Sequence, residues 1–341
     1  MREILRHDAK QYRTFKIQYM KFSTLFALIF LLSACTTVYK NNQHLHQENF
    51  KVIGYLPGRN IDTSKIQFEY LTHINYSFAI PGKDSGYLLP INHPERLVGL
   101  VKKAHNHNVE VFLSIGGWGI GDGGGNDTRF HKLAESEGYR NNFVKSTMQM
   151  VRQYNFDGVD VDWEYPDSSH RSADDFILLM KELRDSLSPA GKKLTAAVVS
   201  YGRQGWGIKN EIFPLVDWLN LMSYDDDKRL TRPHSPYSLA VTTYDYWVTQ
   251  RGLPKQKAVI GLPFYGKPSL NGKGSAYRIL IANGANPEQD GLDSIHYNGI
   301  KTISQKTTFA KQHAAGVMIW EISQDTTGKL SLLKSISKSL K

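Results

Sequence analysis

Four carboxylates stand within the eight residues of the segment DGVDVDWE, residues 157–164. Three of them, Asp160, Asp162 and Glu164, alternate with two valines and a tryptophan. Successive side chains of a β-strand point to opposite faces, so these three acids are expected to share one face. Asp157 has the other parity and is expected at the entrance of the strand.

Three neighbouring acids on one strand face cannot all ionise cheaply in a dry site, so at least one of their pKa values should rise. A carboxylic acid that is still protonated near neutral pH can protonate the leaving oxygen of a glycosidic bond. Glu164 is the outermost and longest of the three and is the expected proton donor. Asp162 and Asp160 are expected beneath it as orienting groups and proton partners.

Three other interpretations stay open on these residues alone. An acidic run can be a solvated face, although alternation with large apolar side chains argues against this. The acids offer the oxygen ligands that Mg²⁺ and Ca²⁺ prefer, but one strand surrounds a cation poorly, and no HExxH motif or Cys/His zinc spacing occurs. The run GIGDGG, residues 119–124, formally matches a dinucleotide-binding GxGxxG, but polar loop follows it instead of a helix. We therefore expect no metal and no cofactor.

Short apolar runs alternate with helical patterns from residue 50 onward. The expected strands are Lys51–Tyr55, His73–Phe78, Glu110–Ser114, Gly158–Glu164, Lys193–Ser200, Trp218–Tyr224, Ala258–Pro263 and Gly316–Trp320, and the helical stretches include Pro94–His105, Thr128–Tyr154, Ala173–Leu187 and Thr243–Arg251. This alternation predicts an α/β fold, a (β/α)8 TIM barrel in one catalytic domain, with a doubly wound open sheet as the alternative. In such a barrel the active groups lie at the carboxyl ends of the strands.

Composition excludes several classes of protein. The chain has 341 residues and a formal charge of +10, part of which lies in residues 1–34. No basic run with interleaved aromatic residues occurs, so we expect no nucleic-acid partner. The single cysteine, Cys35, excludes an intramolecular disulfide.

The setting of Cys35 indicates a lipoprotein. Residues 20–35, MKFSTLFALIFLLSAC, have the layout of a secretory signal whose apolar part is too short to span a bilayer. Its end, LSAC, resembles the bacterial lipobox, in which the cysteine is lipidated. We expect a leader over residues 1–34 (with Met20 as a candidate true start), a tether over 35–49 and the catalytic domain over 50–341. The expected location is the bacterial cell envelope, lipid-anchored at the outer membrane or cell surface.

Four motifs resemble one family. The segment DGVDVDWE is similar to the DxxDxDxE signature of glycoside hydrolase family 18, the chitinase family. The runs SIGG, Ser114–Gly117, and MSYD, Met222–Asp225, match its SxGG and MxYD segments, and Trp320 matches the tryptophan that ends its eighth strand. The resemblance covers roughly residues 50–330. The continuation WEYP is more similar to chitinases than to relatives that act on protein-linked glycans.

The resemblance implies a substrate-assisted retaining mechanism. Glu164 would be the acid and base, Asp162 would accept the N–H of the substrate's acetamido group, Asp160 would be its buried partner, and Tyr224 would bind the acetyl oxygen. Tyr55 and Ser114 would bracket Asp160. The residues implied in substrate binding are Tyr55, Ser114, Gly117, Trp118, Met222, Asp225, Tyr265 and Trp320. Lys267 stands where family members often have arginine.

The resemblance further implies a monomeric, endo-acting chitinase that binds chitin or N-acetylglucosamine oligosaccharides. The stretch after Tyr265 is too short for the large α+β insertion of deep-tunnel relatives, so an open, shallow groove is expected. An endo-β-N-acetylglucosaminidase acting on glycoprotein or cell-wall glycans and a non-catalytic glycan-binding lipoprotein are the alternatives.

Replacing Cys35 with serine should release the protein from membranes or stall its processing, because serine has no thiol to carry the lipid. Immunoblots of membrane and soluble fractions measure this. Wild-type protein found wholly in the soluble fraction would contradict lipid anchoring, and residual attachment of the serine variant would point to another anchor.

Overall fold

The computed structural model describes residues 50–121, 126–167, 171–226, 232–268 and 273–341. The expected leader, the lipidation residue Cys35, the tether and the second half of the GIGDGG run lie outside these described residues. Within the described part of the chain, no helix is both long enough and apolar enough to cross a bilayer.

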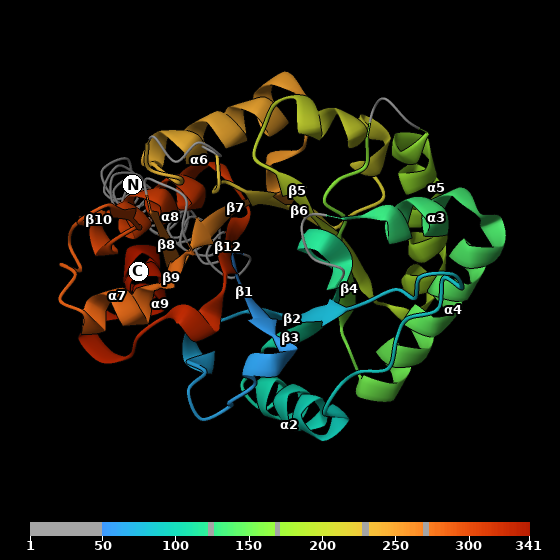
Figure 1. Cartoon of the computed structure of the whole chain (residues 1–341), viewed down its shortest axis with the longest axis horizontal. Coiled ribbons are helices and arrows are strands. Elements are labelled where there is room, and N and C mark those ends of the chain that lie inside the picture. The colour runs from blue at the N-terminus through green and yellow to red at the C-terminus, as the bar shows by residue number, and fades with distance from the viewer. Residues whose placement is uncertain (1–49, 122–125, 168–170, 227–231, 269–272) are drawn as a thin grey trace, which may run out of the picture. The chain divides into compact units, whose positions relative to one another are not determined.

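Parallel strands close into a barrel at the centre of Figure 1. In barrel order they are β1 (Lys51–Pro57), β12 (Gly316–Trp320), β7 (Ala258–Pro263), β6 (Trp218–Met222), β5 (Lys193–Val199), β4 (Gly158–Asp162), β3 (Glu110–Gly116) and β2 (His73–Ala79). The closure confirms the expected (β/α)8 barrel and excludes an open, doubly wound sheet. The bounds of β7 and β12 are those expected, and the other strands differ by one or two residues.

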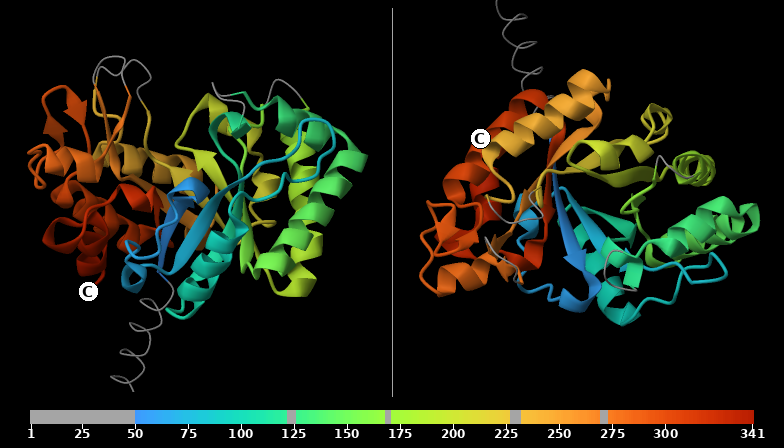
Figure 2. Two further views of the ribbon diagram at one scale, coloured as in Figure 1. Left: turned by 60° about the horizontal axis from the view of Figure 1, so that its bottom comes forward. Right: turned by 45° about the horizontal axis from the view of Figure 1, so that its top comes forward.

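Helices surround the barrel in Figure 1 and Figure 2. They are α2 (Pro94–His105), α3 (Thr128–Glu135), α4 (Glu137–Tyr154), α5 (Ser172–Leu187), α6 (Tyr237–Tyr244) with a π-helical continuation over Asp245–Gln250, α8 (Ile300–His313) and α9 (Leu332–Leu340). The expected helical stretch Thr128–Tyr154 consists of two helices, because Ser136 between them has extended backbone angles, φ −96° and ψ 121°. Its hydroxyl accepts the Tyr139 N–H at 3.4 Å and so caps α4.

The segment between β7 and α8 forms a small four-stranded sheet. It contains β8 (Tyr265–Pro268), β9 (Ser275–Ala276), β10 (Gly291–Leu292), β11 (Ile295–His296) and the short helix α7 (Tyr277–Ala282). A large α+β insertion is absent from the described residues, as expected. The described residues of this segment nevertheless form short strands and a helix that the sequence analysis did not expect.

Strand β4 ends at Asp162, two residues before its expected end at Glu164. Gly116 of β3 pairs with Asp162, and the Gly117 N–H donates to the Asp162 carbonyl at 2.8 Å. A Cβ on Gly116 would lie 2.2 Å from that carbonyl oxygen, and the φ of Gly116 is 117°, so only glycine fits there. Glu164 therefore stands beyond the strand end, outside the ladder that carries the other two acids.

Asp157 lies at the opposite end of β4, at the strand entrance as expected. Its Oδ2 accepts the Val111 N–H of β3 at 2.8 Å and lies 2.8 Å from Nε2 of His105 in α2. Asp157 thus ties β4 to its neighbours at the end of the barrel away from the other three acids.

Candidate active site

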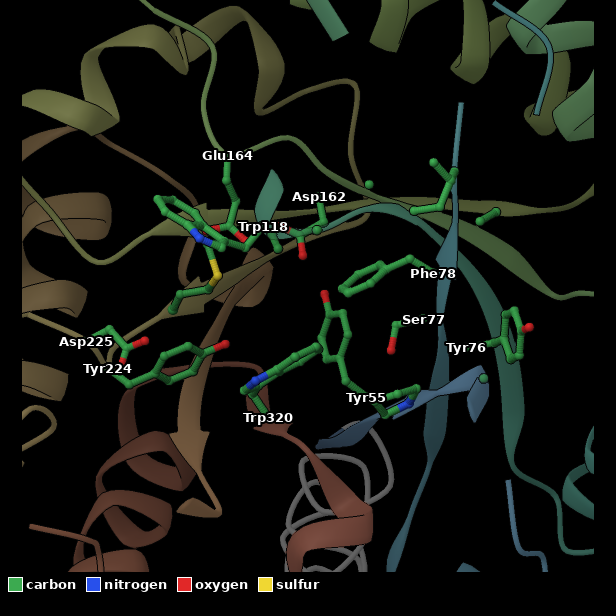
Figure 3. A pocket seen from close by; sticks show the side chains of 18 of the residues that line it. Tyr55, Tyr76, Ser77, Phe78, Trp118, Asp162, Glu164, Tyr224, Asp225 and Trp320 are labelled. Atoms are coloured by element: carbon green, nitrogen blue, oxygen red, sulfur yellow. The ribbon is translucent and has the colours of Figure 1, made fainter. Parts of the chain in front are cut away.

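A cleft of about 1490 Å³ opens at the carboxyl ends of the barrel strands. Most residues that the sequence placed in the site line it: Tyr55, Gly117, Trp118, Asp162, Glu164, Met222, Tyr224, Asp225, Tyr265 and Trp320. Ser114 and Asp160 are instead fully buried inside the barrel, each two residues before the end of its strand. Figure 3 shows Tyr55, Asp162, Glu164, Tyr224 and Trp320 among the side chains that line this cleft.

Asp160 is the most tightly bound of the three acids. Its Oδ2 accepts hydrogen bonds from Tyr55 Oη at 2.6 Å and Ser114 Oγ at 2.8 Å, and its Oδ1 accepts from Thr195 Oγ1 at 2.6 Å and Asn220 Nδ2 at 3.0 Å. Burial raises the pKa of Asp160, and these hydrogen bonds oppose the rise. The bracket of Tyr55 and Ser114 is present, and sequence reasoning missed the two donors that complete it.

Asp162 lies one pleat nearer the cleft and is only 4% exposed. Its Oδ1 has no hydrogen-bond partner among the described residues. Burial raises the pKa of Asp162 well above its usual value, and the carboxyl groups of Glu164 and Asp160 raise it further. A buried carboxyl oxygen without a donor is suited to accept an N–H from a bound ligand.

Glu164 extends into the cleft from beyond the end of β4 (Figure 3). Burial raises the pKa of Glu164 to about 7, a hydrogen bond from Tyr165 opposes this, and the charge of Asp225 adds to it. Near neutral pH a substantial fraction of Glu164 is therefore protonated, which is the state that a general acid needs.

The chain turns sharply at the end of β6 and presents Tyr224 and Asp225 to the cleft. The Tyr224 N–H bonds back to the Met222 carbonyl at 2.8 Å, and Asp225 has a left-handed backbone with φ 60°. Tyr224 Oη lies 3.7 Å from the sulfur of Met318. A thioether is a weak acceptor, so a ligand oxygen can take its place.

Three side chains hold Asp225, and sequence reasoning did not group them with it. Asp225 Oδ1 accepts from Tyr265 Oη at 2.8 Å and lies 3.1 Å from His234 Nδ1, while Lys267 Nζ lies 2.7 Å from Oδ2. Burial acts to raise the pKa of Asp225, but His234 and Lys267 outweigh it, and the pKa is lowered. Asp225 therefore stays anionic near Glu164. No motif marks His234, which lies far along the segment that returns from β6.

Aromatic rings form the floor and the mouth of the cleft. Trp320 contacts Tyr55 edge-on at a centroid distance of 5.6 Å and stacks on Phe78 at 5.7 Å (Figure 3). Sequence reasoning missed Phe78, although its place near the carboxyl end of β2 was a usable signal. Gly117 has φ 84°, and a Cβ there would lie 2.5 Å from the Phe78 ring. Trp118 is 58% exposed, which argues against core packing and leaves its ring accessible to a ligand.

The acids are better suited to proton transfer than to metal binding. Donors already occupy both oxygens of Asp160. Across the described ranges, no group of three His, Cys, Asp or Glu side chains is arranged to hold a metal ion.

Comparisons with known proteins identify the family. The model of the glycosyl hydrolases family 18 matches residues 36–325. Probable chitinase 2 of Drosophila melanogaster is 28% identical over 293 residues, which are 68% of this chain and 59% of the fly protein, so the chain spans less than two thirds of that relative. The GH18 chitinase ChiB from the chitin utilization locus of Flavobacterium johnsoniae has a TM-score of 0.76 at 30% identity, covering 86% of this chain and 94% of that one.

A chitinase-like agglutinin from Robinia pseudoacacia shares the fold, with a TM-score of 0.75 at 24% identity over 85% of this chain and 99% of that one. The fold alone therefore does not decide between catalysis and binding. The family match covers most of the chain, including the acids of β4 and the tryptophan of β12. This chain belongs to glycoside hydrolase family 18 and is a chitinase-like glycoside hydrolase.

Proposed function

We propose that this protein is an endo-acting chitinase that cleaves β-1,4-linked N-acetylglucosamine chains by a substrate-assisted, retaining mechanism. The observation that carries the proposal is the contrast between two buried acids of β4. Asp160 accepts four hydrogen bonds, whereas Asp162 has an oxygen without a partner close to Glu164. The N–H of a sugar's acetamido group is a donor of the kind that this oxygen lacks.

In the proposed reaction, Glu164 donates its proton to the glycosidic oxygen, which leaves with the bonding electrons. The acetyl oxygen of the same sugar attacks the anomeric carbon and forms a cyclic oxazolinium ion. Asp162 accepts the amide N–H and stabilises the positive charge, and Tyr224 Oη donates to the acetyl oxygen and orients it. Glu164, now a carboxylate, takes a proton from water while that water attacks the anomeric carbon, which restores the acid. The bond between the anomeric carbon and the acetyl oxygen breaks in this step, and its electron pair regenerates the acetamido group.

The shape of the cleft supports an oligosaccharide substrate. Aromatic side chains offer flat apolar surfaces, and sugar rings have apolar faces that can stack on them. Trp320 provides such a surface at the floor, beneath the sugar that is cut, and Trp118 provides one for the next sugar. Because the described residues between β7 and α8 form a small four-stranded sheet and one short helix, without a large insertion, we infer an open groove that accepts the middle of a chain.

Two alternatives, an endo-β-N-acetylglucosaminidase and a glycan-binding protein without activity, are separable by assay. Turnover of N-acetylchitohexaose but not of glycopeptides favours the chitinase, and any turnover excludes a pure binder. We also propose that lipidated Cys35 holds the enzyme at the bacterial envelope, and this proposal rests on the lipobox-like sequence alone. We further propose that the enzyme is a monomer.

Glu164→Gln should keep the fold and lose about 10²–10⁴-fold in kcat on chito-oligosaccharides, because an amide cannot protonate the leaving oxygen. Binding of N-acetylchitohexaose should change little. Glu137→Gln, at an exposed position on α4, is the matched control and should retain full activity. A Glu164→Gln enzyme with more than about a tenth of the wild-type rate would mean that another group is the acid.

Asp225→Asn should move the alkaline limb of the pH profile of kcat/KM to lower pH. The proposed acid must be protonated in the free enzyme, so activity falls as pH rises through the pKa of Glu164, about 7. The charge of Asp225 raises that pKa, and its removal should lower it. Asp185→Asn, at an exposed position on α5, should leave the limb in place. A limb that stays unmoved in Asp225→Asn, or moves upward, contradicts this assignment.

A further inference from the structure

Lys306 of α8 is a fully buried lysine with no part in the proposed reaction. Its Nζ lies 2.7 Å from each of three oxygens, which are the Ser235 carbonyl, the Ser235 hydroxyl and the Asn298 amide oxygen. Burial lowers the pKa of Lys306 to about 7, and the charge of Asp290 opposes this. A buried amine is costly unless its hydrogen bonds are satisfied, and here all three oxygens are neutral groups.

The pattern of hydrogen bonds around this amine favours its ammonium form. The Ser235 hydroxyl donates its own proton to the Ser223 carbonyl at 2.6 Å. The Asn298 amide N–H donates to the Ser235 carbonyl at 2.8 Å, so its oxygen faces Lys306 as an acceptor. Three acceptors are fully satisfied only by three donated protons, which the charged form supplies and the neutral amine does not.

This network extends to the cleft along two routes. The Ser235 hydroxyl bonds to the carbonyl of Ser223, the residue before Tyr224. Ser235 follows His234, whose Nδ1 lies 3.1 Å from Asp225 Oδ1. The carbonyl of His234 also accepts the Asp226 N–H at 3.2 Å. Ser235 therefore joins both the outgoing and the returning chain of the β6 turn, and Lys306 attaches Ser235 to α8.

We propose that Lys306 is a positioning residue that fixes Ser235, and through it Tyr224 and Asp225, in the orientation that the active site uses. The kinetic consequence rests on the function proposed above, because Asp225 acts there through its effect on Glu164. A displacement of about 1 Å at a reacting group can cost about 100-fold in rate. His234 and Asp290 are the titratable groups whose charges interact with Lys306.

Lys306→Met tests the proposal, because methionine keeps the linear side chain and removes the three donors. Lys301→Met, at an exposed position on the same helix, is the matched control. Well below the melting temperature of each variant, we expect Lys306→Met to lose about 10- to 100-fold in kcat/KM on N-acetylchitohexaose. We also expect its alkaline limb to shift to lower pH, in the direction of Asp225→Asn, and Lys301→Met to match wild type.

A purely structural role predicts a different result. The melting temperature would fall, but the folded variant would keep the wild-type kcat/KM and alkaline limb, and this outcome overturns the proposal. If Lys306→Met does not fold, Ser235→Ala decides the question, because it removes the bond to Ser223 and leaves the other acceptors of Lys306. We expect a smaller loss of kcat/KM and a shift of the limb in the same direction, and wild-type kinetics in Ser235→Ala would overturn the proposal.

The crystal structure of the folded variant gives a readout that does not depend on turnover. The distance from His234 Nδ1 to Asp225 Oδ1, 3.1 Å in the wild type, should lengthen. An unchanged distance overturns the positioning role even where activity is lost. If the wild type does not cleave N-acetylchitohexaose, the proposed chitinase activity fails, whereas this distance still tests Lys306.

Discussion

The buried carboxyl group of Asp160 is the interaction on which the rest of the site depends. Its four hydrogen bonds come from β1, β3, β5 and β6, so this one group joins those strands to β4 inside the barrel. A carboxyl group without such partners would be very costly to bury, so the contacts determine how β4 sits among its neighbours. Because side chains alternate along a strand, they also place Asp162 one pleat further out, where its Oδ1 meets no donor among the described residues.

The three acids have different roles, which follow from their positions. The acid with four donors holds the barrel together, the acid with an open oxygen is suited to a ligand N–H, and Glu164 stands outside the sheet where it can reach a leaving group. Tyr55 connects these parts, because its hydroxyl bonds to Asp160 while its ring packs against Trp320 in the floor of the cleft. Burial raises the pKa of Glu164, and the charge of the anionic Asp225 raises it further. Buried hydrogen bonds therefore set the geometry of the site, while burial and a neighbouring charge set the protonation of Glu164.

Local patterns predicted most of the barrel and of the cleft. Buried parallel strands appear in the sequence as apolar runs, and the acids on β4 interrupt that pattern, which favoured a functional face. Contacts between segments that are distant in the sequence could not be predicted from local patterns. Thr195 and Asn220 look like ordinary strand residues until the barrel brings them to Asp160, and His234 reaches Asp225 only because the chain folds back after β6. The close approach of Gly116 to the last residue of β4 likewise becomes visible only in the folded barrel.

The central claim is that the substrate's own acetamido group, held by Asp162, is the nucleophile. Cleavage of partly N-acetylated chitosan tests it directly, because a sugar that lacks the acetyl group cannot form the oxazolinium ion. Products sequenced by mass spectrometry should all carry an acetylated sugar at the new reducing end, and NMR should show that this end is released as the β-anomer. Abundant deacetylated reducing ends, or release of the α-anomer, would contradict the account.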